Sequence, residues 1–149
     1  MCRNTQSGVT LIELMTVVVI VSILASIAIP SYRSYLIRTQ RTDAKTALLQ
    51  LRAAQEKFYL QNNRYTNEVT KPVAELGLGL RDTSDNGLYQ IAVTLGTVVA
   101  PMSDQAYTAT ATPVPERGQK DDTKCLTLTL NDVGLRGSSG PGGTDYCWR

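Results

Sequence analysis

The chain contains no histidine, and this absence removes several kinds of active site. Without an imidazole there is neither a Ser–His–Asp nor a Cys–His nucleophile system, and the commonest metal ligand is missing. The glycine-rich residues 138–143 lack the Gly-Lys-Ser/Thr ending of a phosphate-binding loop. We therefore expect the protein not to be an enzyme, and nothing in the sequence calls for a cofactor or a metal ion.

Net charge is also small. The 149 residues carry a formal charge of +2, which by itself does not indicate a polyanionic partner. Three aspartates, Asp121, Asp122 and Asp132, are conceivable calcium ligands. Their spacing resembles no known calcium loop, so we interpret them as an acidic surface turn.

Cysteine is sparse, with Cys2 at the start of the chain and Cys125 and Cys147 near its end. If Cys125 and Cys147 are oxidised, closing the loop between them contributes about 3 kcal/mol of stability. Oxidation requires a periplasmic or extracellular compartment. The alternative is a pair of free, buried thiols.

Residues 9–29 are almost wholly apolar. As a helix they span about 31 Å, enough to cross the core of a bilayer. The only charge among them is Glu13, and an ionisable group inside a membrane segment is functional by default. Residues 30–33 lack the small-x-small pattern of a signal-peptide cleavage site, so we expect the apolar segment to remain in the mature chain.

Two signals in the sequence predict opposite orientations of that segment in the membrane. Cations after the segment outnumber Arg3 before it, which by the positive-inside rule would keep the C-terminal part in the cytoplasm. The cysteine pair favours the opposite side. We follow the cysteines and expect a single-pass protein with its C-terminal part in the periplasm.

A helical pattern continues from the apolar segment to about Asn62. Apolar residues recur at steps of three and four, which predicts one helix over residues 9–62. Pro30 leaves the Ser26 carbonyl without a donor, so a bend or local melting is expected there. The stripe expected to face a core is Ala47, Leu51, Ala54 and Phe58. Basic residues expected off this stripe are Arg38, Arg41, Lys45, Arg52 and Lys57.

Alternation at period two takes over after residue 88, which predicts strands. A long helix packed by its C-terminal half on an antiparallel sheet of about four strands gives an α+β fold. Residues 134–149, rich in Gly and Ser, are expected to form a loop attached through Cys147. The predicted inward-facing residues are Tyr89, Ile91, Val93 and Leu95, then Tyr107, Ala109 and Ala111, then Leu126, Leu128 and Leu130.

Residues 8–15, Gly-Val-Thr-Leu-Ile-Glu-Leu-Met, resemble the N-terminal signature of type IV pilins. In that family a leader ends in Gly, and the mature chain begins with an apolar residue followed by Thr-Leu-Ile-Glu. Pro30 falls where pilins usually carry a helix-breaking proline, and Cys125 with Cys147 resembles the pilin disulfide loop. The resemblance covers the whole chain, although its specificity is concentrated in Gly8–Glu13.

This resemblance implies cleavage between Gly8 and Val9 by a prepilin peptidase and methylation of the new Val9 amine. It implies an inner-membrane anchor surrounded by lipid until the assembly machinery moves the subunit into a cell-surface pilus among other pilin subunits. Glu13 would pair with the Val9 amine of its own or a neighbouring chain and so set the register. The chain departs from the family where Val9 replaces the usual Phe and Ser22 replaces a frequent Gly, which leaves Pro30 as the main weak point.

Four segments follow from this interpretation: a leader (1–8), a membrane and filament-core helix (9–30), an amphipathic helix entering the head (31–62) and a globular head (63–149). The expected function is a structural subunit of a type IV pilus, minor rather than major, which supports pilus biogenesis, twitching motility, adhesion or DNA uptake. One alternative is a type II secretion pseudopilin, many of which rely on calcium. The other is a DNA-binding receptor pilin, for which a basic patch would be needed. Its candidate residues, which we otherwise interpret as part of a solvated loop, are Arg117, Lys120, Lys124 and Arg136.

Overall fold

The computed structural model describes residues 9–96 and 104–149, without the side chains of Gly118 and Lys120. The chain divides after Leu36 into an N-terminal unit and a second unit, Ile37–Arg149, which we call the head. The two units are described separately.

The N-terminal unit consists of the first part of helix α1, Leu11–Asn62. Thr10 precedes the helix, and its Oγ1 accepts a 3.3 Å hydrogen bond from the Glu13 amide. The hydroxyls of Ser22 and Ser26 donate to helix carbonyls one turn earlier. These polar groups are thus satisfied within the helix, as an apolar environment requires. The helix continues through Pro30, so of the two predicted outcomes there, a bend or local melting, the melting is not present.

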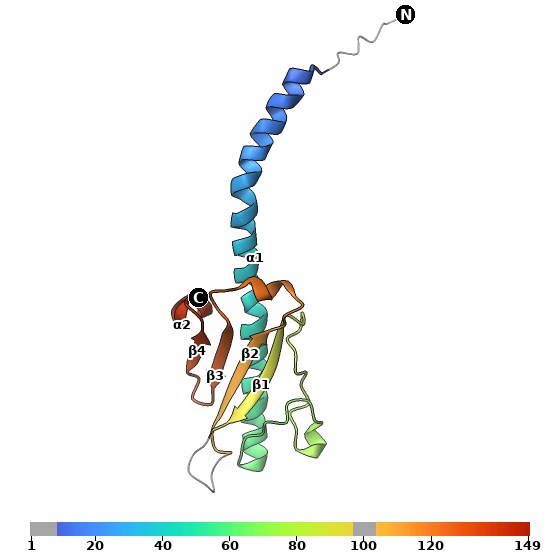
Figure 1. Ribbon diagram of the computed structural model, residues 1–149. Coiled ribbons are helices and arrows are strands. Elements are labelled where there is room, and N and C mark those ends of the chain that lie inside the picture. The colour runs from blue at the N-terminus through green and yellow to red at the C-terminus, as the bar shows by residue number, and fades with distance from the viewer. Residues whose placement is uncertain (1–8, 97–103) are drawn as a thin grey trace, which may run out of the picture. The chain divides into compact units, whose positions relative to one another are not determined.

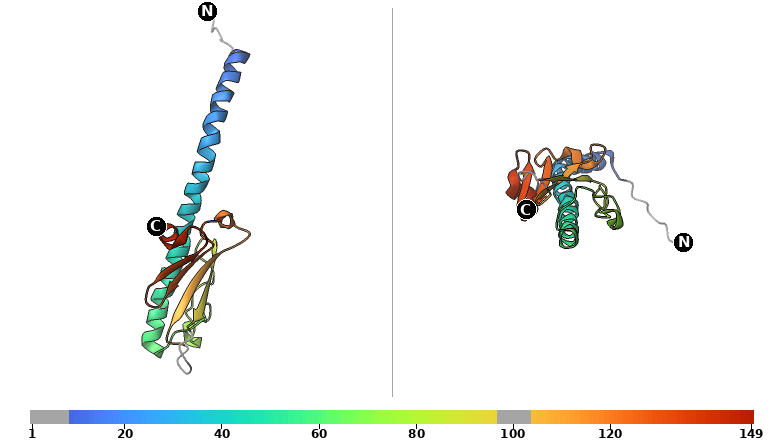
Figure 2. Two further views of the ribbon diagram at one scale, coloured as in Figure 1. Left: turned by 60° about the vertical axis from the view of Figure 1, so that its left-hand side comes forward. Right: turned by 90° about the horizontal axis from the view of Figure 1, so that it is seen from below.

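The head contains the second part of α1 and a four-stranded sheet (Figure 1). The strands are β1 (Tyr89–Leu95), β2 (Tyr107–Pro113), β3 (Thr127–Asn131) and β4 (Arg136–Ser139), and every neighbouring pair is antiparallel in the order β1-β2-β3-β4. Two 3-10 turns, η1 (Val73–Glu75) and η2 (Gly118–Asp121), and the short helix α2 (Gly143–Trp148) complete it. Figure 2 shows the sheet as one layer over one side of the head part of α1. The predicted α+β architecture is confirmed.

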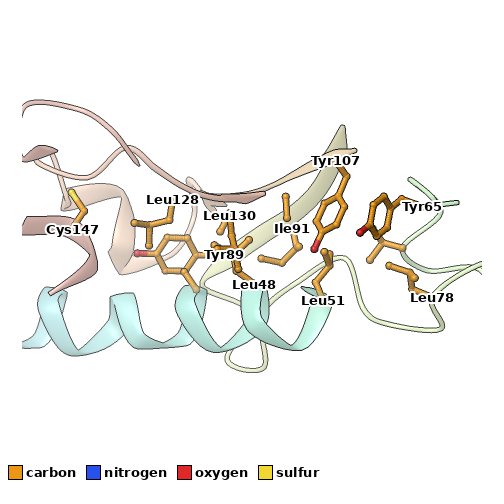
Figure 3. Close-up of a cluster of buried hydrophobic side chains, with 14 of the residues drawn as sticks. Leu48, Leu51, Tyr65, Leu78, Tyr89, Ile91, Tyr107, Leu128, Leu130 and Cys147 are labelled. Carbon is orange, nitrogen blue, oxygen red and sulfur yellow. The ribbon is translucent and has the colours of Figure 1, made fainter. Parts of the chain in front are cut away.

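The core of the head fills the space between α1 and the sheet (Figure 3). Leu51 and Phe58 are buried, and Ala47 and Ala54 pack against the same cluster at half-buried positions, so the predicted helix stripe is confirmed. One strand position is wrong: Leu126 is 52% exposed and lies just before β3, which begins at Thr127. The sheet residues buried against α1 are Tyr89, Ile91, Tyr107, Ala109, Ala111, Leu128 and Leu130.

The prediction of a loop over residues 134–149 is wrong, because this segment forms β4 and α2. Strand β4 reads Arg-Gly-Ser-Ser, without apolar alternation, and it is a strand because it pairs with β3 from Thr127↔Ser139 to Leu130↔Arg136. Helix α2 has six residues, too few to be stable by local propensity alone. Tertiary contacts therefore determine both elements, and the composition of the segment does not reveal them.

Candidate functional site

The predicted processing and assembly residues lie at the start of the N-terminal unit. Gly8 lies outside the described residues. Val9 is 71% exposed, and Glu13 is exposed in the first turn of α1. Beyond Glu13, large apolar side chains from Leu14 to Ile29 are more than half exposed. Among the described residues, α1 is the one helix long and apolar enough to cross a membrane. Its apolar surface therefore needs lipid or other helices around it.

The disulfide between Cys125 and Cys147 is formed, with the two Cα atoms 5.8 Å apart and both residues buried. The prediction of a bonded pair is confirmed, and free thiols are excluded for these two residues. The bond joins the segment before β3 to α2. Cys2 lies outside the described residues.

A buried ion pair attaches this disulfide region to α1. The Arg41 guanidinium donates from Nε to Asp122 Oδ2 at 2.5 Å and from Nη2 to Asp122 Oδ1 at 2.8 Å. The carboxylate also accepts from the Cys125 amide at 3.2 Å and from Gln119 Nε2 at 3.3 Å. The hydrogen bond to Asp122 raises the pKa of Arg41. Two predictions fail here, because Arg41 is not off the core-facing side of α1 and Asp122 is not part of a surface turn.

Tyr146, next to Cys147 on α2, is surrounded by three cations, and we call this group the cation–tyrosine cluster. The distances to its ring centroid are 4.9 Å from Arg41 Cζ, 5.3 Å from Lys124 Nζ and 5.8 Å from Arg38 Cζ. Hydrogen bonding by Arg41 and then Arg38 lowers the pKa of the Tyr146 phenol. The cluster therefore presents positive charge beside a half-buried aromatic ring, a combination suited to anions and planar groups.

The basic patch considered from the sequence assembles only in part. Lys124 and Arg136 both reach α2, the first over Tyr146 and the second over Trp148, with Arg136 Cζ 5.2 Å from the indole. Arg117 lies elsewhere, near Gly87 in the turn before β1. The Lys120 side chain is not among those described. Sequence reasoning missed the contributions of α1, Arg38 and Arg41, although their spacing by three residues was a signal that they share a face.

The three aspartates considered as calcium ligands do not gather around one point. Asp122 is held by Arg41, and no group of three or more Asp, Glu, Cys or His among the described residues could hold a metal ion. The acidic residues therefore give no support to a calcium-dependent head.

Two family models match the chain. Residues 30–129 match the model described as "Type IV minor pilin ComP, DNA uptake sequence receptor", and residues 3–29 match the prokaryotic N-terminal methylation motif. The first match covers most of the head and the second covers the apolar part of α1.

Curated relatives are fimbrial proteins and pilins. A fimbrial protein of Pseudomonas aeruginosa is 39% identical over 94 residues, covering 61% of each chain. The type IV major fimbrial protein FimA of Dichelobacter nodosus is 36% identical over 104 residues, covering 68% of this chain and 60% of FimA. The type IV major pilin protein PilA of Myxococcus xanthus is 47% identical over 60 residues, covering 40% of this chain and 27% of PilA. The chain thus spans about three fifths of the first two relatives and less of the third.

Two solved structures resemble this one at low identity. The non-core minor pilin PilV of Neisseria meningitidis aligns with a TM-score of 0.49 and 22% identity, covering 72% of this chain and 90% of PilV. A type IV pilin of Shewanella oneidensis aligns with a TM-score of 0.46 and 21% identity, covering 67% and 89%.

Proposed function

Because the chain belongs to the type IV pilin family, we propose that it is a structural subunit of a type IV pilus, and a minor one. The observation that carries this proposal is the exposed apolar part of α1, which opens directly after the Gly8–Glu13 signature and leads into a pilin-type head. In the membrane this helix is surrounded by lipid, with the head in the periplasm, and in the filament it packs against other pilin helices. Support for a minor role comes from the model that matches residues 30–129.

Processing gives the first test. We propose that a prepilin peptidase cuts between Gly8 and Val9, that the Val9 amine is methylated, and that the assembly machinery then receives the chain. Mass spectrometry and N-terminal sequencing of the protein from sheared pili should give a mature chain beginning at Val9. Gly8→Arg should block cleavage and leave the chain in the membrane, while Gly8→Ala should be tolerated or slowed. A mature chain that begins at Met1 or beyond Ile29 would contradict the proposal.

The abundance of the subunit tests the minor role. Its molar ratio to the main pilin in sheared filaments should be small, although its removal should reduce the number of pili. If the protein instead forms most of the filament mass, it is a major pilin, and the family assignment stands while the minor role falls.

DNA binding by the head is a second candidate function, favoured by the cation–tyrosine cluster and by the description of the model that matches residues 30–129. Phosphates would contact Lys124 and Arg38, and a base or sugar would pack on Tyr146. All the residues of the cation–tyrosine cluster belong to the head, next to the disulfide, so the head by itself would suffice for this function.

The DNA test uses the full-length protein in detergent and a fluorescein-labelled duplex. Lys124→Glu should weaken binding and reduce the slope of log affinity against log salt by about one. Lys71→Glu is the matched control, because Lys71 is an exposed lysine in the loop before η1 that pairs with Glu68 at 3.2 Å. Binding that is weakened equally by both variants, or that does not depend on salt, would exclude the cluster as a DNA site.

A further inference from the structure

The part of α1 that follows the apolar segment is rich in arginine and tyrosine. Residues 14–42 contain three arginines and neither aspartate nor glutamate. Tyr32 and Tyr35 are 65% and 67% exposed, and Arg33 between them is exposed as well. Tyrosines at the end of an apolar helix are typical of the headgroup level of a membrane, where an apolar ring and a polar hydroxyl are both satisfied. We therefore expect the membrane surface at this level of α1.

The cation–tyrosine cluster begins a short way further along the same helix. Arg38 is nine residues after Ile29, which in a continuous helix is a rise of about 13 Å. Headgroups extend about 5–8 Å beyond the hydrocarbon on each side of a bilayer. The side chains of a helix lean toward its N-terminus, and a long arginine can hold its charged end at the headgroup level. The Arg38 guanidinium is therefore within reach of lipid phosphates.

The cluster carries more positive charge than its own carboxylate balances. The charge of Arg41 is balanced by Asp122, to which it donates two hydrogen bonds. The other two cations, Arg38 and Lys124, are exposed, and their charged groups lie 5.8 and 5.3 Å from the centroid of the Tyr146 ring. The ring thus gathers two exposed cations at one place on the head. Both can donate charge-assisted hydrogen bonds to the oxygens of a phosphate.

We propose that the cation–tyrosine cluster binds the phosphate of an anionic phospholipid in the periplasmic leaflet while the subunit is anchored in the membrane. Arg38 and Lys124 donate to the phosphate oxygens, and the Tyr146 ring keeps the two cations together. The inference rests on the membrane-anchored stage of the proposed pilus function and names the class of lipid that the head contacts. Charge attraction favours phosphatidylglycerol, which is anionic, over phosphatidylcholine, which has no net charge.

Lipid binding gives the cluster two successive occupants. Arg38 and Lys124 are also the cations of the candidate DNA site, so a lipid phosphate would cover them as long as the subunit remains in the membrane. In a filament no bilayer surrounds the head, and the two cations become available to other phosphates. DNA binding by the head would then begin only after assembly.

The test uses the full-length protein in phosphatidylcholine nanodiscs that contain a trace of spin-labelled phosphatidylglycerol or spin-labelled phosphatidylcholine. Electron paramagnetic resonance measures the fraction of each labelled lipid whose motion the protein restricts. We expect phosphatidylglycerol to associate about fivefold more strongly than phosphatidylcholine at low salt. The preference should fall in about 1 M sodium chloride, where exposed charges are screened. Equal association of the two lipids, or a preference that salt does not change, would overturn the proposal.

Charge removal locates the site. Lys124→Gln should lower the preference for phosphatidylglycerol at least about twofold, and adding Arg38→Gln should remove most of what remains. Lys57→Gln is the matched control, because Lys57 is an exposed lysine on α1, 19 residues beyond Arg38, and it should leave the preference unchanged. An equal effect of Lys57→Gln and Lys124→Gln would mean that overall charge attracts the lipid. Loss of the preference with Arg33→Gln but not with Lys124→Gln would assign the lipid to α1 alone. Either result would refute the cluster as the site.

Two further measurements separate this proposal from its neighbours. Excess inorganic phosphate at constant ionic strength should leave the lipid preference unchanged, and its loss would show that the cluster binds free phosphate rather than lipid. The amount of wild-type protein in sheared pili is measured in parallel. Its absence from pili would refute the pilus function itself, whereas normal incorporation without a lipid preference would refute only the lipid site.

Discussion

Arg41 is a residue whose burial and partner the sequence alone does not reveal. It belongs to the same helical stripe as Ala44, Leu48 and Leu51, so the period of α1 places it inward, while its charge argues for the solvent side. In the structure Arg41 is buried, and its charge is balanced by Asp122, which lies 81 positions away in the sequence. Periodicity could have located the residue, but no local pattern identifies a partner at that separation.

Removing one member of this pair should be costly. Asp122→Ala leaves the Arg41 guanidinium buried without a counter-charge and should destabilise the head by about 3–5 kcal/mol. The double variant Arg41→Met with Asp122→Leu should recover most of that loss, because no buried charge remains. Urea unfolding of the full-length protein in detergent, followed by near-ultraviolet circular dichroism, measures both. If the double variant is no more stable than Asp122→Ala, the cost does not come from an uncompensated charge.

Two core tyrosines should make stability sensitive to alkaline pH. Tyr89 and Tyr107 are each 1% exposed, and their hydroxyls have no hydrogen-bond partner among the described residues. Burial raises the pKa of both phenols above the ordinary value of 10.0. Because the pKa of each phenol is higher in the folded state, the unfolded chain loses these protons at a lower pH than the folded chain does. The contribution of the two tyrosines to the free energy of unfolding is therefore fully present below about pH 10 and is lost as the pH rises above it.

The paired substitution Tyr89→Phe with Tyr107→Phe should flatten that alkaline decline. At neutral pH it should change the free energy of unfolding by less than about 1 kcal/mol, since it removes hydroxyls that have no partner in the described part of the head. Melting temperatures from pH 7 to pH 11 provide the measurement, with Tyr32→Phe in the exposed N-terminal unit as control. An unchanged alkaline slope would show that other groups govern it.

Among the elements, those with a strong period were predictable and those held by tertiary contacts were not. The helix over residues 9–62 and three of the strands follow from apolar spacing, and α1 and β1–β3 agree with it closely. By contrast, β4 and α2 carry no such period. Gln55 shows the same limit inside α1: it is buried because its amide bonds both the carbonyl and the amide of Thr66, a contact no propensity predicts.

The disulfide should therefore matter most to the elements that the sequence could not predict. Replacing both Cys125 and Cys147 by Ser should lower the stability of the head by about 3 kcal/mol on the loop-entropy estimate. Amide hydrogen exchange should become faster first in β4 and α2. These two elements would still be joined by the 2.8 Å hydrogen bond that Trp148 Nε1 donates to the Gly137 carbonyl. Amides of β1 and β2 should change later. Equal loss of protection across all four strands would mean that the sheet and α2 form one cooperative unit.

At the scale of the whole molecule, the chain combines an apolar helix that needs a partner with a head that folds around its own core. The helix surface is largely apolar along Leu14–Ile29 and carries no charge there, so apolar packing alone would tolerate many offsets between neighbouring subunits. A filament needs one offset. Glu13, directly before this stretch, is the one charged residue of the apolar segment 9–29, and after the proposed cleavage the Val9 amine lies about one helical turn away from it. In an apolar environment each charge stabilises the other far more than it would in water.

Glu13 should accordingly control assembly without being needed for insertion. Glu13→Val should enter the membrane at least as well as wild type, because it removes the cost of a buried carboxylate. It should be depleted from sheared pili, because the incoming amine loses its partner. Glu13→Gln should lie between the two, since it keeps hydrogen bonding without charge. Quantitative immunoblots of membranes and sheared pili measure both pools in the same cells, with Thr16→Val as control, since the Thr16 hydroxyl is already satisfied by the Glu13 carbonyl at 2.8 Å. Normal incorporation of Glu13→Val with unchanged piliation would show that apolar packing and the heads fix the offset without this carboxylate.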